Sequence, residues 1–377
     1  MENDSSLPNL KDMTLEELEA FISSLGKERY RARQIMACLY RKGASRTSAG
    51  KVIPRHADAV TAVKEEAPLF GEMTTLSKAL RQYLAENTRL YSPLIAKTQV
   101  SRDTTKKILF QLHDGHCVES VLIPGKTHWT VCVSTQVGCR MGCRFCLTGR
   151  QGLIRNLTPA EITGQLTALQ QETPEGPEIQ NIVLMGMGEP LDNYDNVVKA
   201  IRILTSDHAL GFSSRKVTLS TCGLSPIILK LGEDVCVNIA ISLNAPDNDT
   251  RNELMPINRK YPLETVFDAC RNYPMPGRRM ITFEYILIRD VNDSINDARK
   301  LVKLLRGTRC KLNLIAFNEF PGSPFKTPTP ETIAAFQTYL AEHHYTAILR
   351  ASKGRDILAA CGQLKGEWEN SSRPYKL

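Results

Sequence analysis

The sequence contains no apolar run that approaches the roughly 18 residues needed to cross a bilayer. Its first residues, MENDSSLPNLKDM, are acidic and polar and lack the apolar core of a secretory signal peptide. Solenoid repeats and low-complexity tracts are also missing. We therefore expect a globular, cytoplasmic protein without membrane contact, and the 42% hydrophobic and 23% charged residues are typical of that class.

The 377 residues exceed what one hydrophobic core usually serves, so we expect a large domain and a smaller accessory one. The net charge of +8 fits a polyanionic partner but does not by itself demonstrate one. The eleven cysteines are an odd number, in a chain too long for a small disulfide-stabilised domain. Five of them have apolar or mixed neighbours, and we interpret these as small buried hydrophobic residues: Cys38, Cys222, Cys236, Cys270 and Cys310.

The region before residue 90 has the pattern of a small basic helical domain. The stretch TLEELEAFISSLG begins with Thr14 as N-cap, has Glu17 in the position of a capping box, and ends at Gly26. We expect the rest of this region to form a helix over residues 29–43 closed by Gly43, an irregular segment over 44–72 and a helix over 73–87. Its basic residues form either a solvated face over a packed core or a docking surface for phosphates.

From about residue 90 the pattern changes to strands, and beyond residue 155 short apolar strands alternate with helices. About six strand–helix repeats predict a parallel sheet, open or closed, with fewer strands than a full eight-stranded barrel. In such sheets functional groups gather at the carboxyl ends of the strands. Five residues at or just past the predicted strand ends could therefore converge on one site: Cys139, Gly188, Ser220, Asn244 and Asn318.

The stretch GCRMGCRFCLTG places Cys139, Cys143 and Cys146 at the spacing C-x3-C-x2-C, without a fourth cysteine nearby. Structural zinc takes four ligands, so the fourth would have to come from a distant segment. A second interpretation is that the spacing of the cysteines is a coincidence. The Gly- and Arg-rich loop after a strand argues against it. The third reading is a 4Fe–4S cluster held by three thiolates, whose fourth iron remains open to bind a substrate.

This spacing, with Phe145 before the last cysteine, resembles the signature of radical S-adenosylmethionine (SAM) enzymes. The resemblance implies a partial (β/α)6 barrel in which the open iron chelates the amino and carboxylate groups of SAM. One electron from the cluster then cleaves SAM to a 5′-deoxyadenosyl radical. The segment GMGEP looks like the family's Gly-Gly-Glu segment. Matching to the family also implies the SAM contacts, which are Gly188, Glu189, Ser220, Ser242, Leu243, Asn244 and Asn318.

A wider match, from about residue 9 to 365, resembles the RlmN family of bacterial methyltransferases acting on adenine carbon 2 in 23S rRNA and tRNA. The motifs that carry it are VESVLIP, CVSTQVGC, GRQGLIRNLTPAEITGQL, LMGMGEPLDN, LMPIN, FEYILI, NLIAFN and GRDILAACGQL. Read without that match, Cys361 is a small buried residue and Glu119 an exposed strand carboxylate.

The family's mechanism gives these residues chemical roles. Cys361 takes a methyl group from one SAM, and a radical derived from a second SAM abstracts hydrogen from it. The methylene radical adds to carbon 2 and forms a protein–RNA crosslink. Glu119 removes the carbon 2 proton, and Cys132 attacks the sulfur of Cys361, which leaves a Cys132–Cys361 disulfide for reduction. The resemblance also implies an electron donor such as flavodoxin or ferredoxin, and we expect a monomer.

The chain departs from the family pattern in a few places. Residues 45–72 form a longer connection than usual, Asn244 stands where many relatives have His, and LTG follows the last cluster cysteine. We predict an N-terminal helical RNA-docking domain over residues 1–95, connecting strands over 96–124, a radical SAM core over 125–365 and a tail over 366–377.

Three alternatives remain open. The nearest is the related class of enzymes that methylates carbon 8 of the same rRNA adenosine and confers antibiotic resistance. The others are a non-catalytic RNA-binding protein with a zinc or redox-sensing loop, and a radical SAM enzyme for a small molecule.

Overall fold

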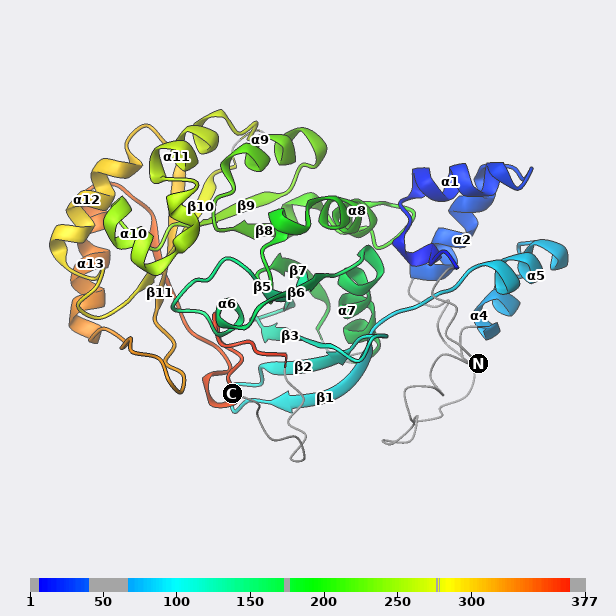
Figure 1. Ribbon diagram of the computed structural model, residues 1–377, viewed down its shortest axis with the longest axis horizontal. Coiled ribbons are helices and arrows are strands. Elements are labelled where there is room, and N and C mark those ends of the chain that lie inside the picture. The colour runs from blue at the N-terminus through cyan, green and yellow to red at the C-terminus, as the bar shows by residue number, and fades with distance from the viewer. Residues whose placement is uncertain (1–6, 41–66, 173–176, 276, 278, 367–377) are drawn as a thin grey trace.

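The computed structural model describes residues 7–40, 67–172, 177–275, 277 and 279–366 (Figure 1). Its main feature is a ten-stranded sheet in the order β1-β2-β3-β4-β7-β8-β9-β10-β11-β12. The strands are β1 (Leu94–Val100), β2 (Lys106–Gln111), β3 (Cys117–Pro124), β4 (Trp129–Cys132), β7 (Ile179–Leu184), β8 (Val217–Thr221), β9 (Asn238–Ser242), β10 (Ile281–Leu287), β11 (Cys310–Ala316) and β12 (Ala347–Arg350).

The seven strands from β4 to β12 pair in parallel, and helices follow each of the first six. The edge strands β1 and β12 are not neighbours, so within the described residues the barrel is partial. This confirms the predicted (β/α)6 architecture. The helices are α7 (Pro159–Glu172), α8 (Tyr194–Thr205), α9 (Ser225–Asp234), α10 (Asn248–Leu254), α11 (Leu263–Asn272), α12 (Ile295–Leu305) and α13 (Pro330–Glu342).

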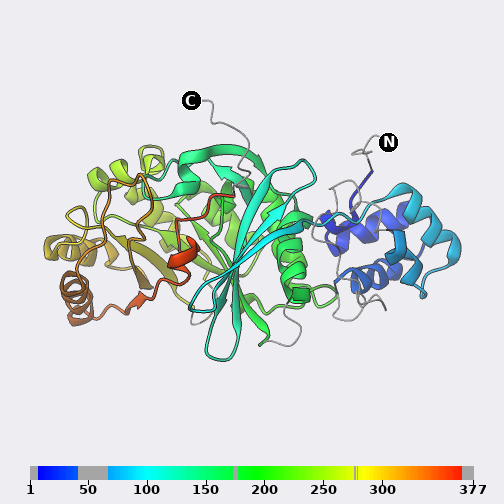
Figure 2. The same ribbon diagram turned by 90° about the horizontal axis from the view of Figure 1, so that it is seen from below.

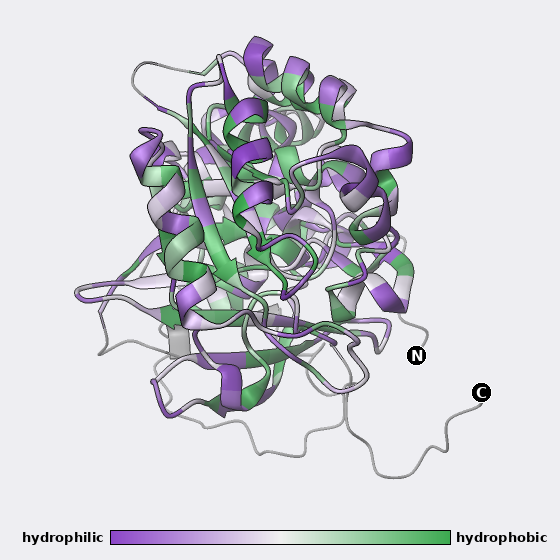
Figure 3. Cartoon of the chain, turned by 90° about the vertical axis from the view of Figure 1, so that its left-hand side faces the viewer, coloured by the Kyte–Doolittle hydropathy of each residue, from purple (hydrophilic) through white to green (hydrophobic). Residues whose placement is uncertain are grey.

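Hydropathy explains this layering, because hydrophobic strands lie inside helices that are polar on their outer sides (Figure 3). Every residue of β10 is buried, as expected for a parallel strand covered on both faces. In α12 the buried residues are Ala298, Leu301, Val302 and Leu305, which follow the helical period and form one apolar stripe.

The predicted strand over residues 129–138 is broken into two. After β4, Ser134 turns inward and its backbone N–H donates to Gln165 Oε1 of α7 at 2.8 Å. The chain then forms β5 (Gln136–Cys139), which pairs with β6 (Gly152–Asn156) in a separate two-stranded sheet. Between them lies the short helix α6 (Leu147–Gln151). The residue pattern did not predict α6, α7, α11, β1 or β6.

The N-terminal helices form a lobe beside the barrel (Figures 1 and 2). They are α1 (Leu15–Ser24), α2 (Tyr30–Tyr40), α4 (Ala67–Glu72) and α5 (Lys78–Asn87). The lobe has its own hydrophobic core, to which α8 contributes Ile203. An ion pair of 2.6 Å between Lys199 Nζ and Glu17 Oε1 also links the lobe to α8. The predicted domain boundaries themselves stay predictions.

The capping box of α1 is present, with Thr14 and Glu17 bonded to each other's backbone N–H groups. Two expectations for this lobe need correction. The segment expected to be irregular ends in the helix α4, and α5 begins only at Lys78, because Ser77 caps it by accepting from Leu80 N–H. The expected helix end at Gly43 and most of the 45–72 connection lie outside the described residues. No helix in the described ranges has the length and apolarity of a membrane span.

Candidate active site

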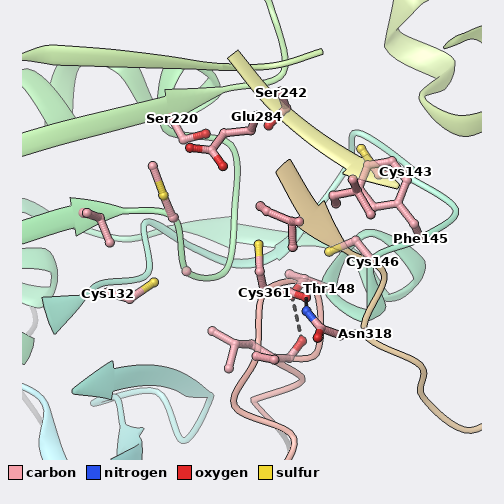
Figure 4. A pocket seen from close by; sticks show the side chains of 18 of the residues that line it. Cys132, Cys143, Phe145, Cys146, Thr148, Ser220, Ser242, Glu284, Asn318 and Cys361 are labelled. Carbon is pink, nitrogen blue, oxygen red and sulfur yellow. Dashed lines mark hydrogen bonds between the residues drawn. The ribbon is translucent and has the colours of Figure 1, made fainter. Parts of the chain in front are cut away.

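A cavity of about 230 Å³ opens at the carboxyl ends of the parallel strands (Figure 4). The structure brings most of the predicted site residues to its wall. Those that line it are Cys132, Cys139, Cys143, Cys146, Gly188, Glu189, Ser220, Ser242, Asn244, Asn318 and Cys361. Leu243 and Glu119 do not line it. The cavity wall therefore unites the three-cysteine loop with Cys132, seven residues before it, and with Cys361, which is distant in sequence.

The three-cysteine loop is held by close backbone contacts. Gly138 has a φ of +75°, and a Cβ there would collide with the carbonyl of Gly152 on β6. At the other end of the loop, Cys146 N–H donates to the Cys143 carbonyl at 3.1 Å. A Cβ on Gly149 would lie 3.0 Å from the backbone nitrogen of Cys143. Glycine at these positions lets the loop fold tightly enough to turn its thiols toward one cavity.

The three thiols are suited to binding a cationic group. Burial raises the pKa of Cys139 to about 12 and the pKa values of Cys143 and Cys146 above their usual range. Repulsion between neighbouring thiolates raises the pKa of Cys143 further. Bound irons remove both penalties, because they favour the thiolate form and neutralise the crowded charge. The donor set therefore fits an iron–sulfur cluster.

The arrangement of the three thiols does not fit a single metal ion. In the described part of the chain, no three His, Cys, Asp or Glu side chains surround one point closely enough to hold one ion. Three thiolates of a 4Fe–4S cluster bind three different irons, so their sulfurs need not meet around one point.

The GMGEP segment packs against the chain itself. A Cβ on Gly186 would lie 2.7 Å from the Val133 carbonyl, and one on Gly188 2.7 Å from the Gln136 Cβ. Gly188 also has a φ of +106°. The glycines are therefore required by the approach of the β4–β5 segment. Both carboxylate oxygens of the buried Glu189 accept backbone N–H groups, from Leu191 at 3.0 Å and from Cys222 at 2.8 Å.

Polar residues at and just past the carboxyl ends of β8 and β9 line the cavity. Ser220 and Ser242 lie at its wall near the ends of these strands (Figure 4). Asn244 adopts a φ of +56°, which asparagine tolerates better than most residues, and its Oδ1 accepts the Ile286 N–H of β10 at 2.9 Å. Leu243 is fully buried and contributes backbone contacts: its N–H donates to the Glu284 carbonyl at 3.0 Å.

Arg251 of α10 is a site residue that the sequence reading missed. It is fully buried, and Nη2 donates to the Cys222 carbonyl at 2.7 Å and to the Ser242 carbonyl at 3.1 Å. Its Nε donates to the Leu243 carbonyl at 3.1 Å. One guanidinium group therefore joins the ends of β8 and β9, which carry Ser220, Ser242 and Asn244. Nothing in the local pattern of α10 marks this arginine as buried.

We expect Arg251→Met to lower the free energy of unfolding by about 2 to 5 kcal/mol, because buried carbonyls lose their donors. Urea unfolding of the apo-protein, followed by circular dichroism, measures the change. Arg271→Met is the control, since the side chain of this exposed residue of α11 makes a cation–π contact with Phe267 and no hydrogen bond or ion pair within the described residues. Equal losses in both variants would show that the buried guanidinium contributes no special stability.

Cys361 lies on a loop fastened to the cluster segment. The Gly362 carbonyl accepts Leu147 N–H at 2.8 Å, and the Leu364 carbonyl accepts Thr148 Oγ1 at 2.7 Å. From the other side, Asn318 Nδ2 donates to the Cys361 carbonyl at 3.3 Å (Figure 4). Asn318 thus positions the loop. Solvent reaches Cys361 through the cavity.

Both spare thiols are held in the protonated form by their surroundings. Burial raises the pKa of Cys132 to about 12. The pKa of Cys361 is also raised to about 12, chiefly because the cavity wall around it limits its hydration, and further by the negative charge of Glu284. The two cysteines are free and lie on the wall of the same cavity. The arrangement therefore places a second thiol on the cavity that Cys361 lines.

Glu119 lies on the same face of β3 as Val121 and Ile123, which line the cavity. The segment after Cys361 covers its carboxylate. Oε2 accepts the backbone N–H groups of Lys365 at 2.7 Å and Gly366 at 3.2 Å, and Oε1 pairs with Lys107 Nζ at 3.0 Å. In this structure Glu119 is therefore buried and bonded to the chain, just outside the cavity wall.

Glu284 of β10 is the second site residue that was missed. It is buried at the cavity wall, and Asn313 Nδ2 donates to its Oε1 at 2.8 Å. Burial raises the pKa of this carboxyl. A signal was available: the apolar strand MITFEYILI contains one charged residue, and a carboxylate is rarely buried without a specific reason.

Comparisons with known proteins identify the family of this chain. The model of the radical SAM superfamily matches residues 133–303, and that of the ribosomal RNA large subunit methyltransferase N-terminal domain matches residues 8–49. The dual-specificity RNA methyltransferase RlmN of Syntrophus aciditrophicus is 62% identical, over 95% of this chain and 97% of that protein. The corresponding protein of Syntrophotalea carbinolica is 50% identical, over 97% of this chain and 92% of that protein.

A solved structure has the same fold over nearly the whole chain. It is a radical SAM methyltransferase from Sphaerobacter thermophilus, 40% identical, with a TM-score of 0.82, and the match covers 96% of this chain and all of that one. Together with the three-cysteine loop and the cavity, these findings show that the chain belongs to the RlmN family of radical SAM RNA methyltransferases, whose cofactors are a 4Fe–4S cluster and SAM.

Proposed function

We propose that this protein methylates carbon 2 of adenosine in 23S rRNA, at the peptidyl transferase centre, and in tRNA, at the adenosine 3′ of the anticodon. The observation that carries the proposal is the single cavity that gathers Cys139, Cys143 and Cys146 together with Cys132 and Cys361. A cluster site alone is common to radical SAM chemistry. Three further thiols lie on the same wall, those of Cys132, Cys222 and Cys361, and in this proposal Cys132 and Cys361 carry and release a one-carbon unit.

Carbon 2 of adenine requires this unusual route. It lies between two ring nitrogens and is electron-poor, so it does not act as a nucleophile toward the methyl group of SAM. When bound by Cys139, Cys143 and Cys146, the cluster supplies the electron that cleaves SAM homolytically. The residues of the chain then have to carry the methyl group, remove a proton and break the covalent link to RNA.

Cys361 carries the methyl group in this proposal. Its S-methyl group, after loss of a hydrogen atom, adds to carbon 2 and links the protein to the RNA. Two SAM molecules are consumed, one for the methyl group and one for the hydrogen abstraction. Asn318 and α6 hold the Cys361 loop against the cluster segment, so the S-methyl group stays near the site of SAM cleavage.

Glu119 and Cys132 complete the cycle in this proposal. Glu119 accepts the carbon 2 proton, and the radical adduct would at the same time lose one electron, which the cluster held by Cys139, Cys143 and Cys146 would take back. To accept the proton, the Glu119 carboxylate has to exchange the Lys365 and Gly366 amides for the substrate. Cys132 attacks the sulfur of Cys361, which releases methyladenosine and leaves a disulfide. We further propose that the protein is a cytoplasmic monomer and receives electrons from a flavodoxin or ferredoxin. The N-terminal lobe docks structured RNA while the target base leaves its stack.

The test is mass spectrometry of digested rRNA and tRNA from cells that lack this protein. We expect 2-methyladenosine to disappear from both RNAs and to return when the wild-type chain is supplied. A methyl group mapped to carbon 8 would instead support the resistance-type activity. If both RNAs keep 2-methyladenosine, the proposed activity is wrong.

A further inference from the structure

Glu284 is a cavity carboxylate to which the reaction above assigns no role. It projects from β10 into the same space as Cys361 (Figure 4). Asn313 Nδ2 bonds to Oε1, and no other donor in the described residues reaches the carboxylate. The second oxygen, Oε2, has no partner among the described residues, but it is not completely buried either. It therefore faces the open part of the cavity. One oxygen of Glu284 is therefore free to accept a proton.

The other carboxylate on the cavity wall is less available as a proton acceptor. Among the described residues that line the cavity, Glu189 and Glu284 carry the only carboxylates, and histidine and aspartate are not represented. Glu189 uses both of its oxygens to hold the backbone N–H groups of Leu191 and Cys222. Protonating Glu189 would weaken the bonds that join the GMGEP segment to β8. This leaves Glu284 as the available base in the cavity.

Cys361 needs such a base. A thiolate, not a thiol, is the nucleophile that accepts a methyl group, and the surroundings of Cys361 disfavour the thiolate. Among the neighbouring charges, Glu284 has the largest electrostatic effect on the Cys361 thiol, which agrees with their common place on the cavity wall. A carboxylate that repels the thiolate cannot stabilise it in advance. It can, however, take the proton as the methyl group is transferred.

We propose that Glu284 accepts the thiol proton of Cys361 during methyl transfer from SAM, an inference that rests on the proposed function. The S–H bond of Cys361 breaks and its proton moves to the free oxygen of Glu284. The thiol electron pair forms the S–CH3 bond, and the methyl–sulfonium bond breaks with its electron pair on the departing sulfur. S-adenosylhomocysteine leaves as a neutral sulfide.

The charges in the cavity favour methyl transfer from SAM to Cys361 with the proton moving to Glu284. The reactants are an anionic carboxylate, a neutral thiol and a cationic sulfonium centre, and each of the three product groups is neutral at the reacting atoms. Neutralising opposite charges is favourable where water is scarce.

The other groups that act on Cys361 are Cys132 of β4, Cys146 of the cluster loop and Arg350 of β12. Burial has the largest effect on Glu284 and raises its pKa, whereas Arg350, Asn313 and Lys311 oppose burial and favour the ionised form.

The experiment compares wild type, Glu284→Gln and Glu319→Gln, using apo-protein reconstituted anaerobically with iron and sulfide. Glu319 is an exposed carboxylate near the Cys361 loop, and it does not line the cavity. Mass spectrometry follows the methylation of Cys361 by SAM without RNA, and equilibrium binding gives the SAM affinity. We expect Glu284→Gln to slow methylation by about 10²- to 10⁴-fold, the usual contribution of a general base, with unchanged SAM affinity.

Labelling of Cys361 by iodoacetamide in the apo-proteins supplies a readout independent of the cofactors. Removal of the Glu284 charge should leave labelling as fast as in wild type or faster, because the thiolate is no longer repelled. Slow methylation with undiminished labelling supports the proposal. It is overturned if methylation stays at the wild-type rate or accelerates, or if SAM affinity falls by the same factor as methylation. Wild-type protein that never methylates Cys361 would overturn the proposed function and this inference together.

Discussion

Replacing Cys143 by alanine should yield a folded protein that retains almost no iron or sulfide. The side chain is half-buried and experiences the charge of both other cluster thiolates, and two thiolates cannot hold three irons of the cluster. We expect iron to fall from about four per chain to near zero after anaerobic reconstitution. Colorimetric iron and sulfide analysis and the visible absorption spectrum measure the loss. SAM cleavage should fall below detection as a consequence.

The matched control is Cys236→Ala, which removes a thiol between α9 and β9, away from the cavity wall; contrary to the buried position expected from its neighbours, this thiol is exposed. It should reconstitute like wild type. Circular dichroism spectra of the three apo-proteins should coincide, which separates loss of the ligand from loss of the fold. A brown Cys143→Ala protein with full iron content would show that the cluster is not held by this loop.

Replacing Cys132 by alanine should trap the enzyme on its RNA. The thiol lies on the same cavity wall as Cys361, and in the proposed cycle its removal leaves the protein–RNA link without a resolving nucleophile. We expect product formation to stop at less than about one methyladenosine per chain, as for a stalled covalent intermediate. An adduct should accumulate as a slower band on a denaturing gel that collapses on ribonuclease treatment.

Cys270→Ala is the control for this variant. Cys270 is a buried thiol of α11 in the barrel core, and it does not line the cavity. Its loss removes a comparable volume, at a cost of about 1 kcal/mol, without touching the proposed chemistry. We expect it to turn over and to form no stable adduct. Normal turnover by Cys132→Ala would instead exclude Cys132 as the resolving thiol.

Local sequence was most informative where the interactions that determine a structural feature lie within one short segment. The capping box of Thr14 and Glu17 was predictable because both bonds close within one helical turn. The alternation of apolar strands and helices predicted the parallel partial barrel, because such strands must be covered on both faces. The spacing of Cys139, Cys143 and Cys146 indicated a cluster with an open iron, and the donor set fits it.

The sequence was less informative where a role depends on distant partners. Gly188 was predicted only as a SAM contact, and the sequence did not show that a Cβ there would collide with Gln136 of the β4–β5 segment. The predicted strand over 129–138 is broken because Ser134 is bonded to a helix that lies 31 residues later. Neither contact leaves a pattern in the local sequence.

The sequence by itself determined the architecture, the cysteine loop and, through its motifs, the family. Only the tertiary structure decided that Arg251 joins two strand ends, that Glu119 is covered by the backbone at Lys365 and Gly366, and that Glu284 shares a cavity with Cys361. The physical reason is that periodicity and spacing act over a few residues along the chain. Burial of a charge and the identity of its partners depend on segments that meet only after folding.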